Sequence, residues 1–175
     1  DCSVHFIKST DDFKKTMSIT PAYLVTQDAD DIIDYSQMTM ELGRRFRALK
    51  LWFVIRCYGV SGLQAIIRDH VAWTVDLAAR IEAAAGFEIT SPPRLGLFSF
   101  RIRRKGMKDG QELDALNARL VDAVNADGTL YLTQTVHDGR YVIRVSIGTT
   151  TTRASDIDLT YQTVTALAAP LLAGK

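Results

Sequence analysis

The chain has 175 residues, of which 47% are hydrophobic, and a formal net charge of +1. This composition is typical of a globular domain that can bury a core. The near-neutral charge argues against nucleic acid or an anionic membrane surface as a partner, since both require a concentrated basic field. Without a spanning apolar stretch or a secretory signal, we expect a cytoplasmic protein with no membrane partner. Cys2 and Cys57 are too few for a disulfide framework or a zinc site.

The first 34 residues read as the continuation of a larger polypeptide. The chain begins at Asp1 with a strand-like run from Cys2 to Ile7, which is typical of a cut chain. Residues 8–34 have little apolar periodicity and carry several aspartates after Pro21, so we expect a long exposed loop. Loops of this length in compact proteins tend to be functional lids or disordered segments.

Two helices are predicted next. Apolar residues at helical spacing predict the first from about Leu42 to Tyr58, and Gly59 ends it. Its stretch Leu51 to Ile55 is apolar on all sides, so it must be buried on most of them or join two packed bodies. A more regular apolar stripe predicts the second helix, which closes near Gly86.

The hydrophobic period then changes from helical to alternating. Strands are predicted at residues 87–90, 96–103, 130–136 and 141–147, with Pro92 and Pro93 separating the first two and an Asp138-Gly139 turn joining the last two. One helix is predicted from Asp109 to Gly128 and another over about residues 155–172. This order predicts a small α+β domain with helices on one face of a mainly antiparallel sheet.

Most of the polar clusters fit a structural role. His5, His70 and His137 lie far apart without ligand-spaced partners, so a metal site is not expected, and His70 reads as a packing residue. No serine lies in a nucleophile-elbow pattern. The densest cationic run comprises Arg101, Arg103, Arg104 and Lys105. We interpret it as a solvated strand end rather than an anion-binding patch.

Two residues are candidates for a site. Gly43 lies beside the predicted start of the first helix, where another group can approach the backbone and the helix end is electropositive; alternatively, it only eases a bend. Tyr23 lies in the predicted loop, where most tyrosines are surface or packing residues. A phenol with a pKa of about 10 keeps its proton at neutral pH, so it can protonate a strongly basic carbon when a closing loop delivers it.

The run from Leu42 to Trp52, continued by Arg56, Tyr58 and Gly59, resembles a signature of the group II pyridoxal-phosphate-dependent decarboxylases that act on aromatic L-amino acids. Asp1-Cys2-Ser3 resembles the strand that follows the cofactor lysine in that family. Pro21-Ala22-Tyr23-Leu24 resembles its mobile catalytic loop. The segments around Phe100 and over residues 141–146 resemble strands of its C-terminal domain.

The resemblance implies an α/β fold of the aspartate-aminotransferase type, in which a large cofactor-binding domain and a small C-terminal domain form an obligate homodimer. Residues 1–49 would then end the large domain, with the mobile catalytic loop at about 8–34. Residues 50–175 would form the small α+β domain. Leu51 to Ile55 would be the buried connector between the two.

The implied activity is that of a lyase, which converts tryptophan, tyrosine or dihydroxyphenylalanine to the amine and CO2 in amine biosynthesis. Tyr23 matches the residue that protonates the substrate α-carbon, on a loop that covers the partner subunit's active site. Gly43 matches a position bordering the substrate side chain, where glycine leaves room for a bulky aromatic group. Residues 36–41 lack the family's Trp-Gln core, which leaves the preferred substrate open.

The resemblance also implies that the pyridoxal 5'-phosphate is bound mainly outside this chain. The lysine that carries the cofactor would lie upstream of Asp1, so we expect the fragment alone to be inactive. Two alternatives stay open. The same fold acts on histidine, glutamate or a sulfinate in other decarboxylases, and the chain could instead be a free-standing α+β interaction domain without catalysis.

Overall fold

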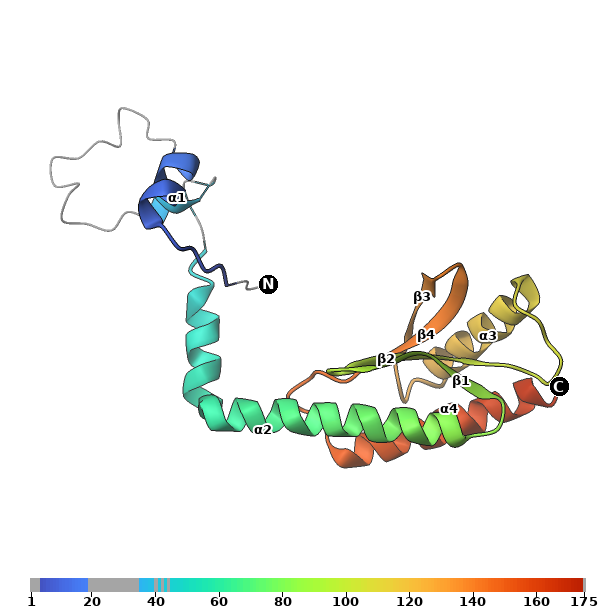
Figure 1. Cartoon of the computed structure of the whole chain (residues 1–175). Helices are drawn as coiled ribbons and strands as arrows, with labels where there is room; N and C mark the ends of the chain where they lie inside the picture. The colour runs from blue at the N-terminus through green and yellow to red at the C-terminus, as the bar shows by residue number, and fades with distance from the viewer. Residues whose placement is uncertain (1–3, 19–34, 40, 42, 44, 175) are drawn as a thin grey trace, which may run out of the picture. The chain divides into compact units, whose positions relative to one another are not determined.

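The computed structural model of the chain describes residues 4–18, 35–39, 41, 43 and 45–174. The chain divides into two compact units, Asp1–Gly59 and Val60–Lys175. The described part of the first unit is helical and irregular, whereas the second combines helices with a sheet (Figure 1). The domain boundary expected between residues 49 and 50 concerns a complete two-domain protein and stays a prediction.

A short helix lies inside the segment that the sequence predicts to be a loop. Helix α1, Thr10–Met17, begins after Ser9, whose hydroxyl accepts a hydrogen bond from the Asp12 N–H at 3.3 Å. Such a serine cap, followed by acidic residues in the first turn, stabilises a helix start. The prediction of a loop over residues 8–34 is therefore wrong at α1. The remainder of that loop, from residue 19, lies outside the described residues.

Helix α2, Ala48–Ala83, is broken by a glycine near its first third. Gly59 leaves the helical conformation with φ 68° and ψ 166°, a combination that glycine adopts far more readily than other residues. The predicted helix end at Gly59 is confirmed. The predicted helix start near Leu42 is wrong, because residues 45–47 are not helical. Before α2, a 3-10 helix η2, Tyr35–Met38, lies against α1.

The second unit packs helices on one face of a four-stranded antiparallel sheet (Figure 1). After α2 come β1 (Phe87–Arg94), β2 (Leu97–Ile102), α3 (Gln111–Asp127), β3 (Thr133–His137), β4 (Arg140–Ser146) and α4 (Ala154–Leu172). The strand order is β1-β2-β4-β3, and each neighbouring pair is antiparallel. The predicted order of elements and the α+β architecture are confirmed.

The core lies between this sheet and the helices. Side chains alternate between the two faces of a strand, and in β2 the residues Phe98, Phe100 and Ile102 are at most 1% exposed. They join buried apolar side chains of all three helices, among them Leu77, Ile81, Leu113, Leu120, Val124, Ile157, Val164 and Leu171. The sequence predicts an inward position for these helix residues, and this is confirmed. Ile67, which the sequence places on the same apolar stripe of α2, is 57% exposed, so the prediction is wrong there.

Strand β1 extends through the two prolines that the sequence places between strands. β1 runs to Arg94 and pairs with β2 irregularly, with register shifts between Ile89 and Ser91 and between Ser91 and Arg94. A proline cannot donate to a ladder, so it is found on edge strands or at bulges. β1 is an edge strand of this sheet. The prediction that Pro92 and Pro93 end the strand is therefore wrong.

Helix α3 replaces a missing strand partner at the end of β2. The β2–β4 pairing ends at Phe100 and Ile143. Beyond it, the Ile102 N–H donates to Asn117 Oδ1 at 2.7 Å, and Asn117 Nδ2 donates to the Ile102 carbonyl at 2.9 Å. Asp114 Oδ1 accepts the Tyr141 N–H at 3.1 Å. Because buried backbone groups need partners, these two side chains fix where α3 sits against the sheet.

The turns at two of the predicted glycines have the expected geometry. Asp138 and Gly139 have φ values of 49° and 72°, as a two-residue hairpin of type I′ requires, and His137 pairs with Arg140 across the turn. Gly128 ends α3 in a left-handed conformation with φ 80°. Both sequence predictions are confirmed.

Gly96, in the turn between β1 and β2, leaves no room for a side chain. A Cβ at Gly96 would overlap the carbonyl oxygen of Ile147, whose N–H donates to the Gly96 carbonyl at 2.7 Å. We expect Gly96→Ala to lower the free energy of unfolding by about 2–3 kcal/mol, because the overlap forces the backbone apart. Gly148→Ala is the matched control, because a Cβ there meets no atom within 4 Å. Chemical denaturation of both variants measures the difference, and equal losses would contradict the steric argument.

Candidate functional site

The predicted substrate residue Gly43 lies in an exposed bend before α2. A Cβ at Gly43 would meet no described atom within 4 Å, so no local contact requires a glycine there. The N–H of Leu49 donates to the Phe46 carbonyl at 3.3 Å, in the turn that opens α2. The first helical residue is Ala48, so Gly43 does not lie beside the electropositive end of the helix as the sequence suggests. Its place at a substrate pocket stays a prediction.

The predicted catalytic residue Tyr23 lies outside the described residues. The structure therefore gives no distance between Tyr23 and Gly43. The catalytic assignment of Tyr23 stays a prediction based on the motif around it.

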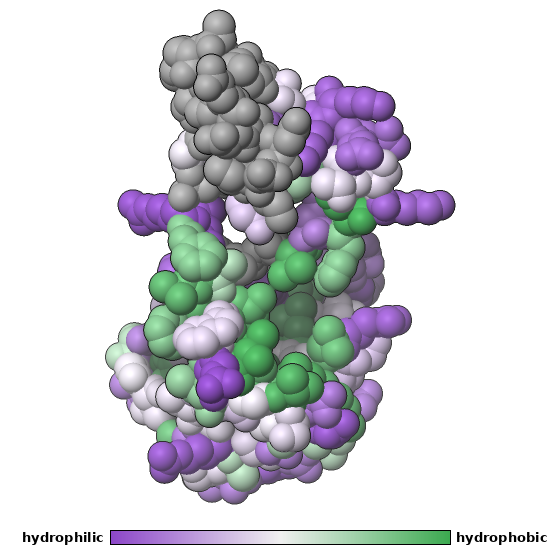
Figure 2. Space-filling view, turned by 90° about the vertical axis from the view of Figure 1, so that its left-hand side faces the viewer, coloured by the Kyte–Doolittle hydropathy of each residue, from purple (hydrophilic) through white to green (hydrophobic). Residues whose placement is uncertain are grey.

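The segment that carries the signature is an exposed apolar helix. Leu51 to Ile55 are 39% to 54% exposed, and Phe46 is 75% exposed. Arg56 lies over the Trp52 ring at 5.7 Å. No described residue of the first unit is buried, and hydrophobic residues gather on the surface that Figure 2 faces. Described residues of this chain do not bury Leu51 to Ile55. Their expected role as the connector between two domains concerns the complete protein and stays a prediction. An apolar patch of this kind is typical of a contact with another polypeptide surface.

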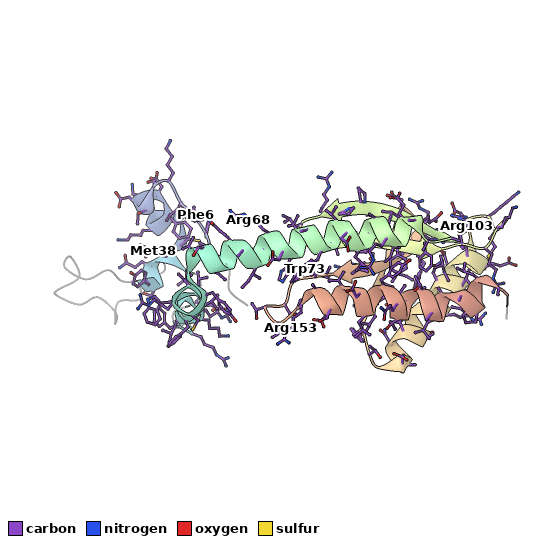
Figure 3. All side chains as sticks on the ribbon, turned by 90° about the horizontal axis from the view of Figure 1, so that it is seen from below. Phe6, Met38, Arg68, Trp73, Arg103 and Arg153 are labelled. Carbon is purple, nitrogen blue, oxygen red and sulfur yellow. The ribbon has the colours of Figure 1, made fainter. Side chains whose placement is uncertain are left out.

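Two residues of the cationic run, Arg101 and Arg103, belong to an ion-pair network, whereas Lys105 is exposed. Arg101 is fully buried; its Nη2 donates to Asp114 Oδ1 at 2.7 Å and its Nη1 to Asp109 Oδ1 at 3.3 Å. Arg103, labelled in Figure 3, donates to Glu88 from Nε and Nη2 at 3.0 and 2.9 Å, and to Asp109 at 2.7 Å. The solvated interpretation is wrong for Arg101, because carboxylates supplied by α3 and the loop before it surround its guanidinium.

The same network shifts two pKa values. The hydrogen bond to Glu88, followed by that to Asp109, raises the pKa of Arg103 above its ordinary value. The hydrogen bond from Arg103 lowers the pKa of Asp109 below 3.8. Charge-assisted hydrogen bonds favour the ionised form of both partners. The hydrogen bond between Arg103 and Asp109 therefore favours the charged form of both groups, and their charges pair with each other.

The described residues form no cluster that fits a metal ion. They contain no group of three histidine, cysteine, aspartate or glutamate side chains that could hold a metal ion. His70 is 8% exposed and packs near Trp73, as predicted, with ring centroids 5.8 Å apart. Two hollows lie on the second unit, and no lysine lines either of them. In the described part of the chain, no helix is long and apolar enough to cross a membrane.

The described lysines therefore do not fit the role of a cofactor lysine. Lys8, Lys15, Lys50, Lys105 and Lys108 are exposed, and Lys14 is only partly buried. A lysine that forms an imine is usually held in a pocket, where desolvation lowers its pKa. That pyridoxal phosphate is held mainly by residues outside this chain stays a prediction.

Sequence reasoning missed the polar residues that organise the sheet. Asp114 and Asn117 lie three residues apart on α3, where they read as ordinary helix polar positions. Arg144 interrupts the apolar strand β4 and is half-buried. The available signal was a charged residue inside each central strand, at Arg101 and Arg144, because a charge in a strand with little exposure needs a partner.

The chain is similar to known decarboxylases and to an aldehyde synthase over most of its length. Residues 1–103 match the family model described as the pyridoxal-dependent decarboxylase conserved domain. Tyrosine/DOPA decarboxylase 1 of Papaver somniferum is 34% identical over 163 residues, which cover 87% of this chain and 32% of that protein. Phenylacetaldehyde synthase of Petunia hybrida is 30% identical over 172 residues, covering 94% of this chain and 34% of that protein.

A solved structure shares the fold of this chain. The crystal structure of Oryza sativa TDC with PLP and tryptamine matches with a TM-score of 0.82 and 29% identity, over 91% of this chain and 34% of that one. The chain thus spans about a third of the length of the curated relatives that it matches.

The buried Arg101 should make Asp114 important for stability. We expect Asp114→Asn to lower the free energy of unfolding by about 2–3 kcal/mol, because it leaves a buried guanidinium with Asp109 as its remaining carboxylate. Asp122→Asn, an exposed position on the same helix, should change it by less than about 0.5 kcal/mol. Urea denaturation of the 175-residue chain compares them, and equal stability of the two variants would contradict the role of Asp114.

The lowered pKa of Asp109 should make stability fall in acid. A carboxyl group with a folded pKa below its unfolded value of 3.8 stabilises the fold above that value, and this contribution is lost as the pH falls through the folded pKa. We therefore expect the unfolding free energy to fall less steeply in Asp109→Asn than in the wild type between about pH 5 and about pH 2. Parallel profiles from denaturation at several pH values would exclude a contribution of Asp109.

Proposed function

The chain belongs to the pyridoxal-dependent decarboxylase family, and on that premise we propose that it is the C-terminal part of an aromatic L-amino acid decarboxylase. The observation that carries the proposal is the match of residues 1–103 to the family model. The substrate class is tryptophan, tyrosine or dihydroxyphenylalanine, and the products are the corresponding amine and CO2. The named activities of the relatives, on tyrosine and DOPA in one case, support this class.

In the complete protein, this chain contributes a proton donor. Pyridoxal phosphate, held by residues outside this chain, would supply an electron sink for the loss of the carboxylate. Tyr23 then delivers its phenolic proton to the substrate α-carbon, which yields the amine. A phenol suits this step because it stays protonated at neutral pH and gives up its proton only to a strongly basic atom.

Gly43 contributes space at the substrate side chain. Without a Cβ, this position leaves room for a bulky ring, which is why we assign it to substrate binding. Its exposed bend and the absence of described neighbours within 4 Å of a Cβ agree with a position that borders a cavity completed by other segments.

The complete protein is a cytoplasmic homodimer in this proposal. Residues 1–49 finish the large domain, and residues 50–175 form the small domain. The exposed apolar face of Leu51 to Ile55 supports the presence of further polypeptide around the signature segment, because water-exposed apolar area of this kind is unfavourable. A homodimer in which the Tyr23 loop covers the partner's site would couple dimerisation to catalysis.

Replacing the proton donor tests the proposal. In the complete enzyme, we expect Tyr23→Phe to lower the rate of amine formation by about 100-fold or more, the usual size of a general-acid contribution, and to let aldehyde appear. The Petunia hybrida relative named as a phenylacetaldehyde synthase shows that a similar chain exists in an aldehyde-forming protein. Chromatography of amine and aldehyde, with CO2 release measured in parallel, separates the two products.

The matched control is Tyr35→Phe, because Tyr35 is 72% exposed and carries the same phenol. It should retain the wild-type rate and product. An unchanged product and rate in Tyr23→Phe would end the assignment of Tyr23. A wild-type complete protein that releases no CO2 from any of the three aromatic amino acids would end the proposed function itself.

A further inference from the structure

Strand β3 forms one edge of the sheet, and some of its backbone groups point away from β4. The two-residue turn that follows His137 makes His137 and Arg140 a hydrogen-bonded pair. Along an antiparallel ladder, such pairs alternate with pairs whose N–H and C=O groups point away from each other. Gln134 and Val136 belong to the second kind, so their backbone groups face the open edge.

Hydrogen bonds elsewhere in the unit agree with this alternation. Tyr141, which pairs with Val136, donates its N–H away from β3 to Asp114 Oδ1 at 3.1 Å. Leu132, four residues before Val136, exchanges both backbone groups with the side chain of Asn125, at 2.8 and 3.0 Å. The side chain of Asn125 therefore closes the edge at its start. Beyond Leu132, the described residues offer no hydrogen bond to the outward groups of β3.

The two edges of the sheet differ in how they are protected against another strand. Strand β1 contains Pro92 and Pro93, which cannot donate, and its pairing with β2 has two register shifts. Strand β3 is fully exposed and pairs with β4 in regular register. Residues 130–136 contain neither a proline nor a charged side chain. Because charges, prolines and bulges are what normally prevent edge pairing, β3 is the edge that can accept another strand.

A second copy of β3 fits this edge by symmetry. When two β3 strands lie antiparallel with Thr135 on the two-fold axis, Gln134 of each copy lies opposite Val136 of the other. Both outward-facing residues then belong to hydrogen-bonded pairs, each of which exchanges two N–H···O bonds. No like charges meet, since the strand is uncharged. Val136, which is 69% exposed, also loses apolar area to water.

The protected β1 edge limits the pairing to this symmetric form. If β3 of one copy paired with β1 of another, the contact would be head-to-tail and could continue as an open chain of copies. The prolines and register shifts of β1 disfavour that contact. Pairing of two β3 edges uses the same strand in both copies, so it closes after two.

We propose that two copies of this chain join through their β3 edges, in antiparallel pairing centred on Thr135, and thereby form one continuous sheet. The partner at this edge is therefore a second copy of the chain. The inference goes beyond the proposed function, because no residue of β3 has a role in decarboxylation there. It adds a second contact between copies, beside the one at which the Tyr23 loop covers the partner's site.

Disulfide formation in the complete protein tests both the pairing and its register. In Thr135→Cys, the Cα atoms of the two introduced residues would lie about 4.5 Å apart, which a disulfide can span. In Thr133→Cys or His137→Cys, they would lie about 14 Å apart along the strands. After oxidation, peptide mass spectrometry should find about tenfold or more of the disulfide between two copies in Thr135→Cys than in either other variant.

A mixture of two variants is the matched control for the register. Position 133 of one copy lies opposite position 137 of the other, so mixing Thr133→Cys protein with His137→Cys protein should produce a disulfide between these two positions. Equal disulfide yields in the three single variants would indicate random collision and would overturn the proposal. An absence of the disulfide in oxidised Thr135→Cys would overturn it as well.

A lysine on the edge tests whether β3 itself makes the contact. Val136 is exposed, so Val136→Lys leaves the core intact, but a charge on an edge strand opposes pairing. In protein that also carries Thr135→Cys, we expect Val136→Lys to lower the disulfide yield about fivefold or more. Val75→Lys adds the same charge at an exposed position of α2 and should leave the yield unchanged. Circular dichroism shows whether each variant is folded, and an unchanged yield in folded Val136→Lys protein would overturn the role of the β3 edge.

Discussion

The second unit depends on the way that α3 closes the end of its sheet. Strands β2 and β4 part after Phe100, and Asn117 and Asp114 take over the hydrogen bonds that a strand would have made. The carboxylate of Asp114 also neutralises the buried guanidinium of Arg101. One helix turn therefore satisfies backbone groups and a buried charge together, which fixes α3 against the ends of β2 and β4.

The sequence predicts the elements of this unit because each leaves a local signal. The alternating run before Ile102, the apolar stripe of α2 and the Asp138-Gly139 turn all act within a few residues, so periodicity and turn chemistry identify them. Gly59 and Gly128 mark helix ends for the same reason, since only glycine readily adopts their conformations.

The sequence predictions that are wrong concern residues whose partners lie far away in the chain. Two successive prolines, Pro92 and Pro93, predict the end of a strand unless the strand lies at an edge of the sheet. Only the strand order shows that β1 is an edge strand. The cationic run looks solvated until Asp109 and Asp114 are brought to it by α3 and the loop before it. The roles of the two predicted site residues stay predictions. Tyr23 is outside the described residues, and a Cβ at Gly43 would meet no described atom within 4 Å that could define a pocket.

The two units differ in where their stability comes from, and this bears on the function. Every buried residue described lies in Val60–Lys175, whereas the signature helix leaves Trp52 and Phe53 more than half exposed. A unit with its own core can fold by itself, but an all-round apolar helix gains its stability from surfaces that other segments supply. Tyr23 and Gly43 belong to the unit of the second kind. The site that we propose there would form only when the surrounding polypeptide assembles. On this proposal, activity depends on assembly rather than on this chain alone.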